Sequence, residues 1–248
     1  VLYKLPPDSA SARFEAFSVS PSGELYVLGV AREGNSDSDV HHYVFSFADD
    51  GSMADKMRVE ASPYLSIDTF TALQSGAFLV AGRFVKAPGS PEPPGKRYTA
   101  LFDASGRLVK NLDATGKVGS GEYAGTAVTR GKDGYTYFVD QTEILVVSPG
   151  GDTVRRLPFT NPYSGSAPTA IQVSQGMLSI MLSKVDKDGR VEPRYLLLNS
   201  LTGDVQGYYQ PSDELGNEMV CFSRTFGYTF LHRTDGGNSL EILTAALR

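Results

Sequence analysis

The feature that most constrains the fold of this chain is an internal repeat. Five times the sequence runs through an alternating strand, a turn that contains glycine, and a second alternating strand. The turn glycines lie about 50 residues apart, at Gly23, Gly76, Gly134, Gly176 and Gly227. A second hairpin follows each of the first four, with turns at residues 49–51, 104–106, 149–151 and 201–203. Because glycine adopts positive φ without steric penalty, both sets of turns indicate hairpins. Each unit is therefore predicted to be a four-stranded antiparallel meander.

Four-stranded units at this period predict a β-propeller. The fifth unit ends after its third strand, whereas residues 1–5 (VLYKL) form a spare alternating strand. We therefore predict an all-β, five-bladed β-propeller of four-stranded antiparallel blades, closed by the N-terminal strand pairing with the last blade. A six-bladed ring, with one upstream blade missing, is the alternative. The predicted single domain has its blades at residues 14–60, 67–113, 124–160, 168–210, and 218–248 plus 1–6.

Two segments resemble a known family. Residues 20–27 (SPSGELYV) are similar to the SPDG-LYV turn of bacterial six- and seven-bladed propellers of the NHL and YncE-like type, and residues 101–109 (LFDASGRLV) are similar to their outer hairpin. The resemblance implies the fold. It leaves the function open, because such propellers include lactonases, lyases, sensors and binding scaffolds. The chain departs from the family in having five units rather than six or seven.

Charge and cysteine content exclude several classes of function. The chain has 23 Lys and Arg against 28 Asp and Glu, a net charge of −5, which argues against nucleic acid as a partner. The single cysteine, Cys221, excludes an intrachain disulfide framework and a multi-cysteine zinc site. We expect its thiol to be buried, and we expect no cofactor.

The ends of the chain bear on where the protein resides. No apolar run approaches the length needed for a transmembrane segment. The sequence begins at Val1 rather than at Met, which indicates that an upstream segment has been removed. We expect a protein exported to the periplasm or the extracellular space, with a cytoplasmic location as the alternative.

The loops predict one binding face. In a propeller, the loops that join second to third strands emerge on one face, and here they are long at residues 32–42, 83–97, 184–194 and 233–238. The second of these loops is rich in proline and is interpreted either as a stiff flap over the face or as an exposed loop. Basic residues end four of the second strands and are predicted to form a positive rim, namely Arg32, Arg83, Lys184 and Arg233. The alternative is that they form solvated ion pairs with acids in the loops.

Aromatic and histidine residues extend the list of candidate ligand-binding residues. Tyrosines recur in the connections between blades, at Tyr64, Tyr123, Tyr163 and Tyr209, where they could stack on sugars or peptides or could instead wedge between blades. His232 lies in blade five and His41 and His42 in blade one, which are neighbours in a five-bladed ring. Their spacing does not have the form of a zinc site, so no metal site is predicted.

Two functions fit these residues. The first is a non-enzymatic binding scaffold that recognises a protein, peptide or glycan (carbohydrate) ligand on the loop face. The alternative is a hydrolase or lyase that acts on an anionic sugar or lactone at the channel mouth, where Arg83 and Arg233 would hold the anion. Its candidate catalytic carboxylates are Asp68, Asp140 and Glu143. No catalytic motif favours this alternative, and the sequence leaves the oligomeric state open.

Overall fold

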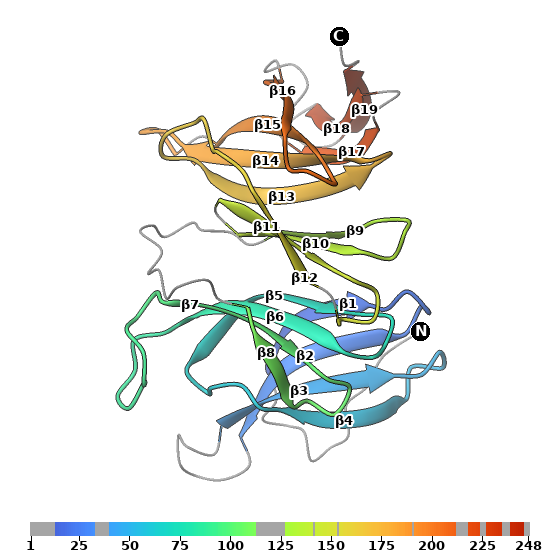
Figure 1. Ribbon diagram of the computed structural model, residues 1–248, viewed down its shortest axis with the longest axis vertical. Coiled ribbons are helices and arrows are strands. Elements are labelled where there is room, and N and C mark those ends of the chain that lie inside the picture. The colour runs from blue at the N-terminus through green and yellow to red at the C-terminus, as the bar shows by residue number, and fades with distance from the viewer. Residues whose placement is uncertain are drawn as a thin grey trace. The chain divides into compact units, whose positions relative to one another are not determined.

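The computed structural model confirms an all-β chain of five antiparallel sheets (Figure 1). It describes residues 13–32, 40–112, 127–140, 142–152, 154–189, 191–211, 218–223, 227–234 and 239–245. In each sheet the strands follow one another in chain order and pair antiparallel, as a meander requires. We call these sheets blades 1 to 5.

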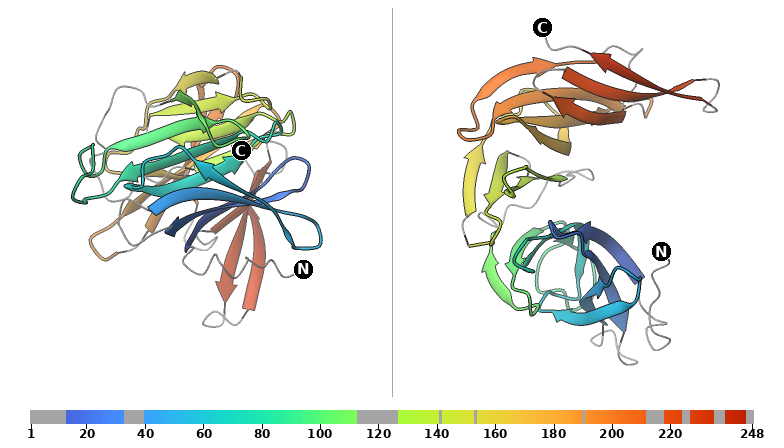
Figure 2. Two further views of the ribbon diagram at one scale, coloured as in Figure 1. Left: turned by 90° about the horizontal axis from the view of Figure 1, so that it is seen from below. Right: turned by 90° about the vertical axis from the view of Figure 1, so that its right-hand side faces the viewer.

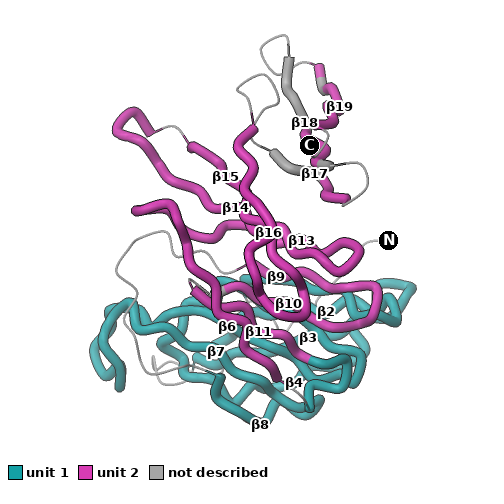
Figure 3. Tube along the Cα trace, turned by 45° about the horizontal axis from the view of Figure 1, so that its top comes forward, with its two compact units in different colours: residues 1–122, 148–153 teal, residues 123–147, 154–248 magenta. Residues whose placement is uncertain are grey.

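Contacts between Cα atoms divide the chain into two compact units (Figure 3). Unit 1 comprises residues 1–122 and 148–153, and unit 2 comprises residues 123–147 and 154–248. Each unit is described by itself below.

Unit 1 contains two four-stranded blades. Blade 1 consists of β1 (Arg13–Val19), β2 (Leu25–Arg32), β3 (Val40–Phe47) and β4 (Met53–Val59). Blade 2 consists of β5 (Leu65–Ala72), β6 (Phe78–Phe84), β7 (Arg97–Phe102) and β8 (Leu108–Asn111). The two sheets pack face to face (Figure 2) around an aromatic core in which Phe70, Phe78 and Phe102 are buried.

Unit 2 contains the other three blades. Blade 3 consists of β9 (Ala127–Arg130), β10 (Thr136–Asp140), β11 (Glu143–Val147) and β12 (Val154–Pro158). Blade 4 consists of β13 (Ala167–Ser174), β14 (Met177–Val185), β15 (Val191–Asn199) and β16 (Val205–Tyr209). Blade 5 consists of β17 (Glu218–Ser223), β18 (Gly227–Thr234) and β19 (Ser239–Ala245).

The core of unit 2 lies between its sheets. Aliphatic residues of blades 3 and 4 form one cluster, which includes Val146, Ile180 and Leu196. Blades 4 and 5 meet through aromatic rings, because Tyr195 and Tyr228 are fully buried with centroids 4.7 Å apart. Apolar residues on alternate strand positions thus face a neighbouring sheet, as predicted from the alternating pattern.

The turn prediction is confirmed where the structure describes the turns. Gly23, Gly76, Gly134 and Gly176 have φ angles of 93°, 79°, 80° and 77°. The fifth hairpin turn, residues 224–226, lies outside the described residues, as does the N-terminal segment 1–5. Closure of the ring by that segment, the six-bladed alternative and the single-domain assignment therefore stay predictions. Among the described residues there is no helix long and apolar enough to span a membrane.

Candidate functional site

The innermost strands of four blades share a β-bulge. The pairing register shifts by one residue within β1, β5, β13 and β17, leaving Glu15, Asp68, Thr169 and Val220 as the extra residues. A bulge bends its strand and redirects the extra side chain, and bulges recur next to functional sites. The extra residue is acidic only in blades 1 and 2, which together form unit 1.

Glycines opposite the bulges let the strands approach closely. Gly29 pairs with Phe14 and Gly82 with Ile67, immediately before the bulged acids. A Cβ atom on Gly82 would lie 2.1 Å from the carbonyl oxygen of Ser66. The bulge that positions Asp68 therefore depends on the missing side chain at position 82.

Asp68 lies with two arginines, and we call Asp68, Arg83 and Arg97 the Asp68 cluster. A guanidinium nitrogen of Arg83 lies 3.7 Å from a carboxylate oxygen of Asp68. Arg97 pairs with Arg83 across β6 and β7. Burial raises the pKa of Asp68, although the charges of Arg83 and Arg97 act to lower it. A partly buried carboxylate beside two cations is a candidate for recognition of an anion or for acid–base chemistry.

Blade 1 has an acid at the same bulge position, Glu15, and we call Arg13, Glu15 and His42 the Glu15 cluster. Arg13 donates a hydrogen bond of 2.7 Å to Glu15. Nδ1 of His42 lies 3.8 Å from the other carboxylate oxygen of Glu15. Only 9% of the Glu15 side chain and 1% of the His42 side chain are exposed, so this pair is buried.

The tautomer of His42 follows from its second contact. Its Nε2 lies 3.0 Å from the carbonyl oxygen of Ser62. A carbonyl oxygen only accepts, so Nε2 carries the hydrogen and Nδ1 of the neutral ring presents a lone pair to Glu15. Among the described residues, neither that Nδ1 nor Oε2 of Glu15 has a hydrogen-bond partner.

Sequence reasoning identified Asp68 and Arg83 but missed Glu15, Arg97 and the burial of His42. His42 and Arg97 occupy the same position in the two blades, because they pair with Val30 and Arg83, which are themselves equivalent. One signal was present in the sequence. Glu15 and Asp68 both stand eight residues before a turn glycine, Gly23 and Gly76 respectively.

We expect His42 to make the stability of unit 1 depend on pH. Burial lowers its pKa below the ordinary value of 6.5, with Arg13 and His41 acting in the same direction and Glu15 and the Ser62 bond opposing. The unfolded chain therefore binds this proton more tightly than the folded chain. The free energy of unfolding of unit 1 falls as the pH drops from about 6.5 through the lower pKa of folded His42. Above about pH 6.5 His42 makes no contribution. Urea unfolding between about pH 7.5 and pH 5 measures this loss.

The His42→Gln variant is the control for this prediction, since a glutamine amide can still donate to Ser62 but does not titrate. Its stability should change less with pH than that of the original protein. An equal pH dependence in both proteins would contradict the assignment to His42.

The residues predicted to form the basic rim lie near the ends of β2, β6, β14 and β18. Arg32 and Lys184 are exposed near the ends of β2 and β14. Arg83 is partly exposed and faces Asp68. Arg233 and His232 lie in β18, but their side chains are outside the described part of the structure. The basic rim therefore stays a prediction.

The other two candidate acids lie in blade 3. Asp140 and Glu143 pair at the hairpin between β10 and β11, and the side chain of Asp140 is outside the described part. Glu143 accepts a hydrogen bond from Arg156 on β12 and forms an ion pair with it. Glu143 thus has a structural partner in the neighbouring strand.

The predicted tyrosines mostly take part in packing. Tyr163 lies under Arg194, whose guanidinium carbon is 4.5 Å from the ring centroid. Tyr209 stacks on Tyr228 with centroids 4.7 Å apart, in the interface between blades 4 and 5. Tyr123 lies outside the described residues.

The proline-rich loop is closed by hydrogen bonds at its base. Its ends are joined by a 2.9 Å bond from the Phe84 amide to the Lys96 carbonyl, and Lys96 forms a 2.6 Å ion pair with Glu92. Tyr64 lies against the loop, because a Cβ atom on Gly89 would approach its hydroxyl to 2.9 Å. This loop therefore forms an ordered wall on blade 2.

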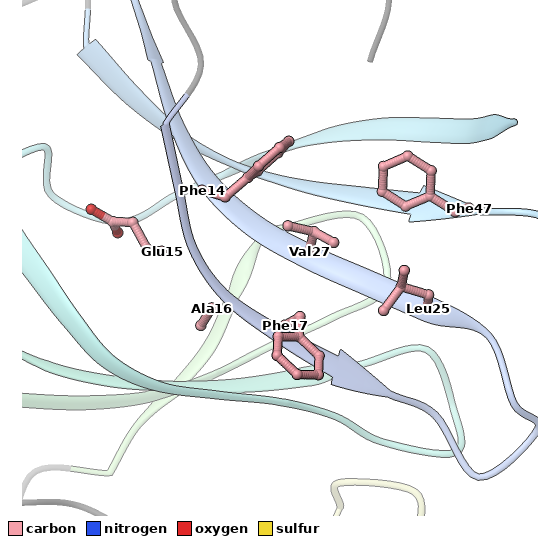
Figure 4. A pocket seen from close by; sticks show the side chains of 7 residues that line it. All are labelled: Phe14, Glu15, Ala16, Phe17, Leu25, Val27 and Phe47. Atoms are coloured by element: carbon pink, nitrogen blue, oxygen red, sulfur yellow. The ribbon is translucent and has the colours of Figure 1, made fainter. Parts of the chain in front are cut away.

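The other face of blade 1 has an apolar hollow of about 500 Å³ (Figure 4). Phe14, Phe17 and Phe47 line it, and Glu15, which also lines it, extends from the other side of β1, away from the three rings. Phe17 is 73% exposed. Each blade of a closed propeller packs against two neighbours, so ring closure as predicted from the sequence would cover this face.

Two further expectations concern cysteine and metal. The prediction of a buried thiol is wrong, because Cys221 is exposed. Within the ranges that the structure describes, there is no group of three or more His, Cys, Asp or Glu that could hold a metal ion.

Comparisons with known proteins support the fold. No protein-family model and no curated protein matches the chain. Among solved structures, the Neurospora crassa Pan2 WD40 domain matches with a TM-score of 0.52 and 12% identity, over 98% of this chain and 67% of that chain. YCF48 bound to D1 peptide matches with a TM-score of 0.50 and 13% identity, over 98% and 67% respectively.

A glycosidase also appears among these structures. The exo-β-1,3-galactanase of Phanerochaete chrysosporium matches with a TM-score of 0.48 and 10% identity, over 96% of this chain. The chain spans only 60% of the length of that enzyme. At these identities the similarities show a β-propeller fold and leave the function to the residues of the chain itself.

Proposed function

We propose that this β-propeller is a non-enzymatic binding scaffold that recognises a carboxylate-bearing protein or peptide ligand at the inner strands of blades 1 and 2. The observation that carries the proposal is the repeated cluster of unit 1, in which a bulged acid lies beside cationic side chains. Arg13, Arg83 and Arg97 outnumber the two acids, Glu15 and Asp68. A guanidinium binds a carboxylate through two parallel hydrogen bonds, which suits an acidic side chain or a C-terminus.

The two clusters lie on neighbouring strands. β1 and β5 contact each other, and the hydroxyl of Ser18 accepts a 2.9 Å hydrogen bond from the Ala72 amide. A ligand that runs across these strands would meet both bulges in turn. The fold of YCF48, which was solved with a peptide, is compatible with such a role.

The test measures binding of fluorescently labelled peptides by anisotropy, with acidic, neutral and basic peptides compared. We expect preferential binding of acidic peptides, which weakens as salt is added because the attraction is electrostatic. Arg97→Ala should weaken binding about 10–100-fold, since a hydrogen bond to a charged group is lost. Asp68→Asn should strengthen binding about 3–10-fold, because it removes a negative charge that competes for the arginines.

Arg107→Ala is the matched control, because Arg107 is an exposed arginine of unit 1 that pairs with Asp103 in the outer hairpin. It should leave binding unchanged. If no peptide class binds, or if Arg97→Ala and Arg107→Ala behave alike, the proposed function is wrong.

The alternative function, a hydrolase or lyase for an anionic sugar or lactone, is favoured by one observation, the raised pKa of Asp68. A carboxyl group that holds its proton longer than usual can act as a general acid. The same Asp68→Asn variant separates the two functions, since an enzyme would lose turnover whereas the scaffold would bind its ligand more tightly.

A further inference from the structure

Unit 2 contains a cavity of about 600 Å³ that the proposed function does not use. Its size falls within the range of about 300–1,000 Å³ that is usual for small-molecule sites. The hairpin turns of blades 3 and 4 form most of its wall, and Ser223 of blade 5 completes it. The lining residues are Gly131, Lys132, Asp133, Tyr137, Val173, Ser174, Gln175, Gly176, Ser200 and Ser223.

The cavity lies at the end of the blades opposite to the predicted loop face. Residues 131–134 join the first and second strands of blade 3, and residues 175–176 do so in blade 4. In an antiparallel meander these turns stand at the other end of the sheet from the loops that join second to third strands. The cavity is therefore distinct from a site on the loop face.

The chemistry of the lining points to a neutral, hydroxyl-rich ligand. The lining carries one cation, Lys132, and one anion, Asp133, both exposed, so it has no net charge that would favour an anion or a cation. Asp133 accepts hydrogen bonds, Lys132 donates them, and the hydroxyl and amide groups around them do both. The ring of Tyr137, whose hydroxyl is hydrogen-bonded to Ser200, supplies an apolar surface together with Val173.

Gln175 adds an independent observation, because it is held in an unfavourable backbone conformation. Among the residues that the structure describes, it is the one non-glycine residue with positive φ, at 48°. Glycine would occupy that turn position without strain. Gln175 and Gly176 form the two-residue hairpin turn between β13 and β14, which requires positive φ at both positions, and Gln175 also lines the cavity.

We infer that this cavity binds a neutral mono- or disaccharide. Hydroxyl groups of the sugar would donate to Asp133, accept from Lys132 and Gln175, and exchange hydrogen bonds with the serines. The inference is independent of the proposed function, because it concerns another ligand, another face and other residues.

The test is saturation-transfer NMR on the full chain with D-glucose, D-galactose, maltose and lactose, with glucuronate as the charged comparison. At least one neutral sugar should receive saturation at millimolar concentration and should bind more tightly than glucuronate. Asp133→Asn should weaken that binding about 10-fold. This variant keeps the turn intact, because an asparagine side-chain oxygen can still accept the 3.1 Å bond from the Tyr135 amide.

Gln175→Gly is the second variant and separates ligand binding from folding. It should weaken sugar binding about 3–10-fold while leaving Tm unchanged or raising it by about 2 °C, since the strain at this position is removed. Asp188→Asn, at an exposed aspartate in the turn between β14 and β15, is the matched control and should bind as the original protein does.

Three results would overturn the inference. The first is that none of the neutral sugars receives saturation. The second is that glucuronate binds as well as or better than the neutral sugars. The third is that Asp133→Asn and Gln175→Gly both bind the sugar as tightly as Asp188→Asn, which would place the sugar elsewhere on the protein.

Discussion

Replacing Phe78 by alanine is expected to lower the free energy of unfolding of unit 1 by about 3–5 kcal/mol. Phe78 is 1% exposed and lies between blades 1 and 2. Its ring stacks on Phe102 at 5.4 Å and contacts Phe70 at 5.7 Å between centroids. Alanine would leave a cavity that the surrounding rings cannot fill by small movements. Because the chain has no tryptophan, unfolding in urea is best followed by circular dichroism.

Phe17→Ala is the matched control for this prediction. At 73% exposure, Phe17 should contribute less than about 0.5 kcal/mol to stability. A small effect of Phe78→Ala would contradict the described core. A large effect of Phe17→Ala would show instead that the apolar face of blade 1 is covered in the folded protein, as the predicted closure of the ring requires.

Replacing Gly82 by alanine is expected to destabilise unit 1 by about 3 kcal/mol and to disturb the Asp68 cluster. The added Cβ would lie 2.1 Å from the Ser66 carbonyl oxygen and 3.0 Å from the Ile67 Cα, both backbone atoms. A backbone atom cannot rotate aside as a side chain can, so β5 and β6 must separate at the bulge. We expect binding of acidic peptides to fall together with the midpoint of urea unfolding.

Gly207→Ala provides the comparison, because its Cβ would meet only the Leu197 side chain at an ordinary 3.9 Å. This variant should be close to neutral in stability. If Gly82→Ala also proves neutral, the close approach at the bulge is not as the structure describes it.

The fold could be predicted because its signals are local. The alternation of apolar and polar residues and the recurring turn glycines are both read within a few residues of the chain. The structure confirms these signals as five antiparallel sheets and as positive φ at Gly23, Gly76, Gly134 and Gly176. The strand that would close the ring depends on pairing between distant segments, and no local signal reports such pairing.

The candidate site was only partly predictable, for the same physical reason. Asp68 and Arg83 were identified separately. Asp68 was identified as an acid at the start of an inner strand, and Arg83 as a basic residue at the end of a second strand. Their association with Arg97 depends on the register between β6 and β7, which brings residues of separate strands together. His42 falls at the end of the predicted loop 32–42, whereas β3 buries it against Glu15.

The bulges have a consequence for how the blades should be compared with one another. Each bulge adds one residue to a strand in which side chains alternate between two faces, so the inward and outward positions exchange places on either side of the bulge. In blades 1 and 2 the extra residue stands eight positions before the turn glycine, and in blade 4 Thr169 stands seven before Gly176. An alignment of the copies without gaps would therefore match inward positions of one blade with outward positions of another, and a phase correction of one residue restores the correspondence.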